Sequence, residues 1–166
     1  KYKLVIIGVT GDTHNNLKNI KTICSIFNQN GVDLVFHTGD VTLPKSLNAF
    51  KDLNCPLIVV LGNNDIGERE GLEAVSSEFK CSIFEEPFST ELNQIKISVV
   101  HHPDLIDVKM LKNNDLILHG HTHRYRMEEK KGCLIFNPGE CAGFLKNKNN
   151  IGIIDLQELV PKVISF

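Results

Sequence analysis

Long hydrophobic runs are missing from the sequence. Its clean apolar stretches have the length of Leu57 to Leu61, whereas a membrane-spanning helix needs about 20 apolar residues in succession. The apolar segment that ends at Val9 runs directly into Gly11 and Asp12 without a small-residue cleavage site, so we interpret it as a first β-strand and not as a secretory signal. We therefore expect no membrane partner and a cytoplasmic location.

An excess of positive charge is also missing. The 18 Lys and Arg residues are outnumbered by 20 Asp and Glu residues, which gives a net charge of −2 at pH 7. Proteins that bind nucleic acid nonspecifically carry a broad basic surface. The composition therefore predicts no extended nucleic-acid partner, and it leaves open whether the chain forms a homo-oligomer.

The cysteines follow no pairing pattern. They are scattered and odd in number, and none is spaced as a metal knuckle or a redox pair. We interpret them as reduced thiols that mostly fill the core. They are Cys24, Cys55, Cys81, Cys133 and Cys141.

Length and composition fit one domain. The 166 residues suffice for one hydrophobic core and are too few for two well-packed ones. With 42% hydrophobic and 23% charged residues, the chain lies near the globular average, which excludes a disordered tail, a coiled coil and a collagen-like repeat. No linker or change in composition divides it, so we expect a single domain over residues 1–166.

Hydrophobic periodicity predicts the layers of the fold. In the first half, strands at 4–9, 34–36 and 57–61 alternate with helices at 17–27 and 43–50, and such crossovers imply parallel strands. The second half is mostly strand, at 81–84, 94–100, 116–119, 125–129, 133–136, 151–156 and 160–166, with short helices near 72–79 and 108–111. We predict an α/β (α+β) fold, a four-layer αββα sandwich of two packed mixed sheets with the helices outside.

Candidate metal ligands follow one strand after another. Because the carboxyl ends of strands line the ligand crevice of open α/β sheets, residues far apart in sequence can meet there. Each piece taken alone is also typical of an ordinary turn. The residues at these positions are Asp12, His14, Asp40, Asn63, His101, His121 and His123.

The segment from His119 to His123 carries the clearest single signal. Histidines two apart on an extended segment project to the same side, so His121 and His123 are expected to reach one metal centre. Two histidines on a solvated surface are the alternative interpretation.

The order of the motifs is more specific than any one of them. GDTHNN, TGD, GNND, VVHH, GHTH and NPG follow one another between Leu4 and about Leu156. This succession resembles the metallophosphoesterase family, also called calcineurin-like phosphoesterases. It is most similar to the small single-domain phosphodiesterase branch, which is related to the retromer scaffold subunit.

The resemblance implies a site for two divalent transition-metal ions. Mixed oxygen and imidazole ligands suit manganese, which we expect, and also nickel, iron or zinc. A hydroxide shared by the two ions would attack phosphorus and hydrolyse small phosphate diesters such as nucleotides. By resemblance, one ion would be held by Asp12, His14 and His123, the other by Asn63, His101 and His121, and Asp40 would bridge both.

One position departs from the wider family. Many larger relatives have a histidine directly after the metal-binding asparagine, where it protonates the leaving group, whereas this chain has Asn64, and an amide is no general acid near neutral pH. Loss of such an acid typically lowers the rate by about 10²- to 10⁴-fold.

His102 is a candidate for supplying the proton from the other side, and a hydrogen-bonded surface histidine is the alternative. His101 and His102 both fit the ligand position, and we favour His101.

Other residues beside the expected site have two interpretations each. Glu140, in place of the family's serine, would orient a ligand histidine or lie in solvent. Arg124 and Arg126 are expected on alternate positions of one strand, where they would contact a phosphate or form a solvated face. His37 and His119 are interpreted as packing residues or as neighbours of ligands.

Two other functions stay open on the same fold. The retromer relative uses it as a protein-interaction scaffold, but its metal motifs are eroded, whereas all seven candidate ligands are present here. A phosphomonoesterase would use the same ions. The lack of a histidine after Asn63 favours diesters over monoesters.

Overall fold

The computed structural model describes residues 5–166, so Leu4, which was expected in the first strand, lies outside the described residues. Two sheets form the centre of the molecule. The larger one has six strands in the order β11-β10-β1-β2-β3-β4, and the smaller one has five in the order β5-β6-β7-β9-β8. Both sheets mix parallel and antiparallel pairs, as the sequence predicts.

The six-stranded sheet contains the parallel crossovers of the first half. Its strands are β1 (Ile6–Thr10), β2 (Leu34–His37), β3 (Leu57–Val60), β4 (Cys81–Phe84), β10 (Asn150–Asp155) and β11 (Val160–Ser165). Strands β1 to β4 are parallel, and β10 pairs antiparallel with β1 and β11.

The five-stranded sheet comes from the second half. Its strands are β5 (Phe88–Leu92), β6 (Ile95–Val99), β7 (Leu116–Leu118), β8 (Arg126–Lys130) and β9 (Cys133–Asn137). The helices are α1 (Leu17–Gln29), α2 (Pro44–Asn48), α3 (Arg69–Ser76) and α4 (Val108–Asn113), with short 3-10 helices η1 (Ala49–Asp52), η2 (Ile66–Glu68) and η3 (Pro103–Leu105).

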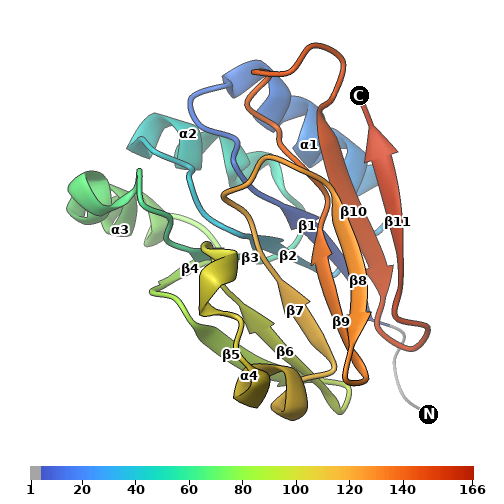
Figure 1. Cartoon of the computed structure of the whole chain (residues 1–166). Helices are drawn as coiled ribbons and strands as arrows, with labels where there is room; N and C mark the ends of the chain where they lie inside the picture. The colour runs from blue at the N-terminus through green and yellow to red at the C-terminus, as the bar shows by residue number, and fades with distance from the viewer. Residues whose placement is uncertain (1–4) are drawn as a thin grey trace.

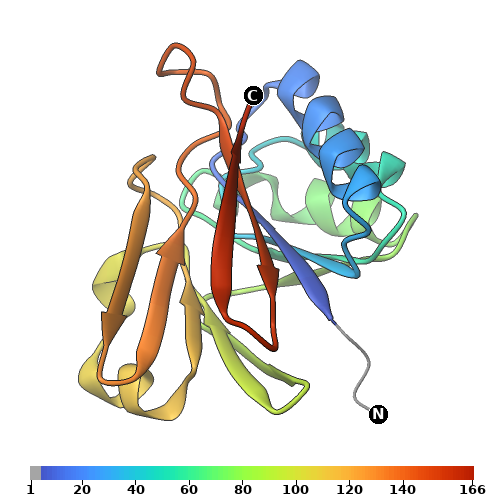
Figure 2. The same cartoon turned by 90° about the vertical axis from the view of Figure 1, so that its right-hand side faces the viewer.

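Helices cover the outer faces of both sheets. Helices α1 to α3 lie on one side of the strands and α4 on the other (Figure 1 and Figure 2). Alternation along each strand divides the core accordingly, because neighbouring side chains point to opposite faces. Val35 and Val59 pack under the helices, whereas Phe36 and Val60 pack between the two sheets. The predicted four-layer αββα sandwich is confirmed.

The β5–β6 hairpin differs from the expectation. Strand β5 was not foreseen, and residue Gln94, expected in a strand, lies in the turn of the β5–β6 hairpin. Asn93 and Gln94 have φ values of 49° and 67°, and two successive left-handed residues form a tight hairpin turn.

No helix within residues 5–166 has the length and hydrophobicity required to cross a bilayer.

Candidate metal centre

Five loops meet at the carboxyl ends of β1, β2, β3, β6 and β7. Backbone hydrogen bonds join the first two loops, from Asp12 N–H to Gly39 O at 2.9 Å and from His14 N–H to Asp40 O at 2.9 Å. A further bond from Gly120 N–H to the carbonyl of the β6 loop joins the loops of the smaller sheet. The seven candidate ligands lie on these five connections, as the strand-end argument predicts.

The backbone of most candidate ligands is strained. Non-glycine residues with positive φ cost about 1–3 kcal/mol each and persist where the surrounding structure holds them, most often at functional sites. Five of the seven candidates have this conformation. They are Asp12 (46°), His14 (45°), Asp40 (60°), His121 (69°) and His123 (56°).

The Asp40 carboxylate lies at the centre of the group. Its Oδ2 is 3.5 Å from His101 Nε2 and 3.8 Å from His14 Nε2, so it lies between residues of both expected metal positions. Asn64 donates its backbone N–H to Oδ1 at 3.0 Å and its side-chain amide to Oδ2 at 2.8 Å. Burial acts to raise the pKa of Asp40, but the bonds from His101 and Asn64 outweigh it and hold this pKa well below the ordinary value.

Asp12, His14 and His123 form one cluster. Their ligand atoms lie within 4.8 Å of one another, and Asp12 Oδ1 is 3.7 Å from His123 Nε2. Burial raises the pKa of Asp12 from 3.8 to about 6, against the lowering effect of His123. Burial also lowers the pKa of His14, which favours the neutral imidazole that a metal needs.

Two atoms of this cluster are buried without a hydrogen-bond partner among the residues that the structure describes. They are Asp12 Oδ2 and His14 Nε2. A buried polar atom without a partner costs about 1–3 kcal/mol. A carboxylate oxygen and an imidazole nitrogen are ligands that divalent transition metals accept, so the residues present fit a metal ion.

Glu140 contacts the His123 ring. The Glu140 side chain is fully buried, and its Oε2 lies 3.0 Å from His123 Nδ1, while its Oε1 accepts the N–H of Leu145 at 2.5 Å. A carboxylate on Nδ1 leaves Nε2 of the same ring facing Asp12. This is the usual way in which a neighbouring carboxylate sets the tautomer of a metal-binding histidine.

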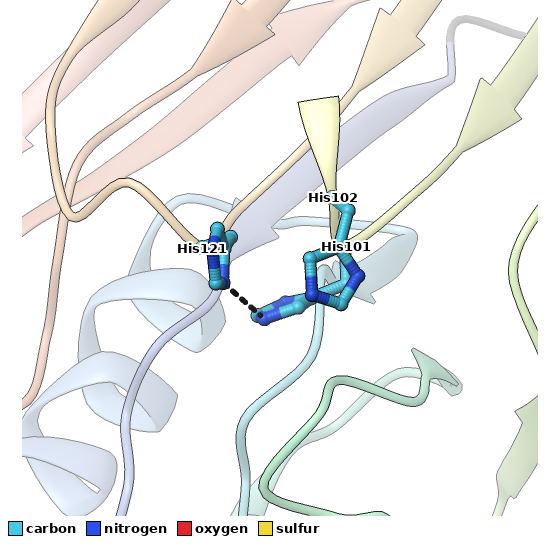
Figure 3. A group of neighbouring side chains, drawn as sticks. All are labelled: His101, His102 and His121. Carbon is cyan, nitrogen blue, oxygen red and sulfur yellow. Dashed lines mark hydrogen bonds between the residues drawn. The ribbon is translucent and has the colours of Figure 1, made fainter. Parts of the chain in front are cut away.

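His101, Asn63 and His121 form the second cluster. His101 Nδ1 lies 2.9 Å from Thr38 O, and because a carbonyl only accepts, this nitrogen carries the hydrogen. Its Nε2 lies 3.0 Å from Asn63 Oδ1 and 3.3 Å from His121 Nδ1. Burial acts to lower the pKa of His101, but the Asp40 carboxylate outweighs it and raises this pKa. Figure 3 shows the imidazoles of His101, His102 and His121 grouped, with the dashed line between His101 and His121.

His102 has a different environment from His101. His102 is one-third exposed, whereas His101 is fully buried. His102 Nδ1 contacts Glu86 Oε1 at 2.6 Å, and the other oxygen of Glu86 accepts both backbone N–H groups, at 2.6 Å from His101 and 2.9 Å from His102. Burial acts to raise the pKa of Glu86, but these hydrogen bonds outweigh it and lower this pKa.

The extended backbone expected at His121 and His123 is wrong. Their positive φ values interrupt the extended conformation that the expectation assumed. His121 consequently faces His101, and His123 faces Asp12.

The expectation that one strand carries both Arg124 and Arg126 is also wrong. Strand β8 begins at Arg126, and Arg124 lies in the exposed connection before it.

Both other histidines neighbour the site without entering the clusters. His37 is buried and its Nε2 lies 2.9 Å from Thr13 Oγ1. His119 is also buried, with Nδ1 3.0 Å from Gly120 O and Nε2 3.5 Å from Arg126 Nη1. The Arg126 guanidinium is bound mainly to Glu128, at 2.7 and 3.0 Å.

Two residues of the site were missed from the sequence. Asp65 is fully buried and accepts the backbone N–H groups of Asp40, Thr42 and Gly62 at 2.6–2.8 Å, so it joins the loops after β2 and β3. Glu86, described above, is the other. Asp65 belongs to a segment with the composition of a turn and Glu86 to no motif, so no local signal distinguishes either from an exposed carboxylate.

Residues 5–159 match the calcineurin-like phosphoesterase superfamily domain. The chain belongs to this superfamily of phosphoester hydrolases. Phosphodiesterase MJ0936 of Methanocaldococcus jannaschii is 35% identical over 159 residues, which cover 92% of this chain and 93% of that protein. The resemblance found in the ordered motifs is thereby confirmed.

Two solved structures have the same fold. One described as a novel archaeal phosphodiesterase has a TM-score of 0.84 and 32% sequence identity, over 98% of this chain and all of the other. Vacuolar Protein Sorting 29 from Cryptosporidium parvum has a TM-score of 0.63 at 19% identity, over 98% of this chain and 97% of the other. At that identity the second similarity bears on the fold alone.

Proposed function

We propose that this calcineurin-like phosphoesterase is a phosphodiesterase for small diesters, such as those of nucleotides, and that it uses two divalent transition-metal ions, with manganese as the expected metal. The observation that carries the proposal is the buried pair of unpartnered atoms, Asp12 Oδ2 and His14 Nε2, beside a carboxylate shared between two histidine clusters. The proposed ligands are Asp12, His14 and His123 for one ion, Asn63, His101 and His121 for the other, and Asp40 for both.

The residues around the ligands prepare them for cations. When bound, two such ions supply an activated water molecule and neutralise charge on the phosphoryl oxygens. Asp40 is kept ionised by its hydrogen bonds, and Asn64 fixes the direction of both of its oxygens. Glu140 holds the His123 ring by Nδ1. We assign positioning roles to Asn64 and Glu140, and a contact of Arg124 with the substrate phosphate stays a prediction.

We also propose that His102 protonates the departing oxygen. The contact of Nδ1 with Glu86 leaves Nε2 for the substrate, and the ring is partly exposed beside the ligands. His102→Gln should slow hydrolysis of a diester with an alkyl leaving group by about 10²-fold, and should change hydrolysis of a 4-nitrophenyl diester far less, because nitrophenolate leaves without a proton. Equal effects on both diesters would remove His102 from this role.

Metal-dependent hydrolysis is the direct test. The purified chain, stripped with a chelator, should be inactive on bis(4-nitrophenyl) phosphate and regain activity with manganese, nickel or zinc. Asp107→Asn, at the exposed N-cap of α4, is a control that leaves this activity unchanged. Full activity after exhaustive chelation contradicts the proposal.

The alternatives have distinct outcomes in the same assay. Faster turnover of 4-nitrophenyl phosphate than of the diester indicates a phosphomonoesterase. Bound metal without hydrolysis of either ester indicates an interaction scaffold. We favour the enzyme because a related protein that covers nearly the whole chain is named a phosphodiesterase.

A further inference from the structure

A cavity opens beside the second cluster of candidate ligands. It has a volume of about 260 Å³, and its walls include Asn63 and His102. Ligand pockets of proteins commonly have about 300–1,000 Å³, so this cavity suits a group the size of one aromatic ring or one sugar. Because Asn63 belongs to the proposed metal site, a group in the cavity would be attached directly to a phosphate at the ions.

Part of the cavity wall is apolar. Leu61, at the end of β3, is nearly buried, whereas Ile66 on η2 is 72% exposed at the rim. A planar organic group that enters the cavity would cover the Ile66 side chain and remove its apolar surface from water. The apolar wall therefore favours an organic arm of the substrate over a second phosphate.

Another part of the wall is acidic. Glu85 and Glu86 line the cavity together with Arg69. The Arg69 guanidinium is already bound to two carboxylates, since Nε donates to Glu73 Oε1 at 2.8 Å and Nη1 donates to Glu85 Oε1. The lining thus holds two carboxylates against one guanidinium, whose charge Glu73 also offsets, and an excess of negative charge in a partly enclosed site repels an anionic ligand.

We propose that this cavity binds the larger organic arm of the phosphodiester, and that its carboxylates restrict the arm to uncharged or cationic groups. The inference rests on the proposed function, because it assigns a substrate class to that same site. The Arg69 clamp fixes Glu85 at the rim by joining the start of α3 to the segment after β4. An arm with hydroxyl or amino groups would donate to Glu85, whereas a carboxylate or phosphate on the arm would be rejected.

The test compares two esters that differ in one charge. Methyl 4-nitrophenyl phosphate and methyl 3-carboxy-4-nitrophenyl phosphate both release a coloured phenolate, and only the second has an anionic ring. We expect wild type to have the higher kcat/KM on the ester with the uncharged ring. The readout is the ratio of the two kcat/KM values, in which any change in metal loading or folded fraction cancels.

Variants at the acidic wall should move this ratio in opposite directions. Glu85→Lys should lower the preference for the ester with the uncharged ring by about tenfold, because the substitution replaces repulsion of the anionic ring by attraction. Arg69→Gln should increase this preference. Ile66→Ala should raise KM for both esters and leave the ratio unchanged. All three side chains are largely exposed, so the variants are expected to fold.

Glu158→Lys is the matched control. It makes the same charge change in the exposed turn between β10 and β11, away from the residues that line the cavity, and should leave the ratio at the wild-type value. A ratio that does not respond to Glu85→Lys, or that responds equally to Glu158→Lys, overturns the cavity assignment alone. Failure of wild type to hydrolyse either ester with any metal overturns the proposed function and the assignment together.

Discussion

The two carboxylates nearest the proposed ions have pKa values displaced in opposite directions. Asp12 has one oxygen without a partner, and burial raises its pKa to about 6. Asp40 has hydrogen bonds on both oxygens, which lower its pKa in spite of burial. A cation between them would supply the missing partner of Asp12 and would use the charge that Asp40 already carries.

Asp40→Asn should empty both metal positions at once. The amide keeps the shape but loses the charge that two dications share, so we expect a loss in affinity of more than about 100-fold for each ion, beyond the 10- to 100-fold typical of residues that only support a ligand. Equilibrium dialysis with metal analysis measures the stoichiometry. Glu140→Gln, which touches His123 only among the proposed ligands, should remove one ion, and loss of a single ion from Asp40→Asn contradicts a bridging role.

His37 should make the metal-free protein sensitive to acid. Burial lowers the pKa of His37 from 6.5 to about 3, so from pH 6.5 down to about 3 the unfolded chain binds more protons than the folded one. The free energy of unfolding therefore decreases as the pH is lowered, and this residue contributes at most about 1.4 kcal/mol per pH unit to the decrease. Urea unfolding between pH 7.5 and 5 should show a shallower decline for His37→Gln than for wild type, and parallel declines would contradict the assignment.

At the scale of the elements, close approach of the loops decides the geometry of the site. The loops after β2 and β3 touch through Gly39 and Gly62, which leave no room for a side chain. A Cβ on Gly62 would lie 2.3 Å from Asp40 Oδ1, and one on Gly39, where φ is 107°, would lie 2.5 Å from His101 Nδ1. Glycine at these positions lets the ends of parallel strands bring Asp40 and His101 together.

Gly62→Ala should therefore damage both the fold and the site. The added methyl group has to displace Asp40, and such overpacking costs about 1–3 kcal/mol. Thermal unfolding and metal titration should both weaken. Gly67→Ala, on η2 with open space around its Cβ, is the matched control and should change the free energy of unfolding by less than about 1 kcal/mol. Equal effects of the two substitutions would argue against the close contact.

At the scale of the whole molecule, the sandwich brings ligands from both sheets to one edge. The larger sheet supplies Asp12, His14, Asp40 and Asn63, and the smaller sheet supplies His101, His121 and His123. The apolar layer between the sheets sets the spacing of the two groups. Metal binding should consequently stabilise the packing of the two sheets and not only the loops.

Metal should raise the melting temperature of the whole domain in one transition. Saturation at 100 times the dissociation constant contributes about 2.7 kcal/mol per site, which corresponds to about 5–10 °C for a domain of this length. Calorimetry with manganese, before and after a chelator, measures the shift. Asp40→Asn should abolish the shift, and its persistence in this variant would place the stabilising ion elsewhere.

Sequence patterns predicted the layers because they depend on local periodicity. The apolar run from Leu34 to Phe36 and the helical spacing of Ile20, Cys24 and Phe27 are visible in any window of a few residues. The β5–β6 hairpin was less visible, because its turn is built by Asn93 and Gln94 without glycine. The order of the motifs identified the superfamily and proposed the seven ligands, but it did not distinguish His101 from His102.

The sequence by itself thus determined the fold class, which follows from local periodicity, and the residue types at the strand ends. The family followed from the resemblance of the ordered motifs. Only the tertiary structure decided that His101 is buried with Nδ1 on Thr38, whereas His102 contacts Glu86. Only the tertiary structure showed that Asp65 joins two loops and that a cavity with an acidic wall adjoins Asn63. These features depend on contacts between residues far apart in sequence. No local pattern records such contacts, because burial and hydrogen-bond partners exist only after the sheets have packed.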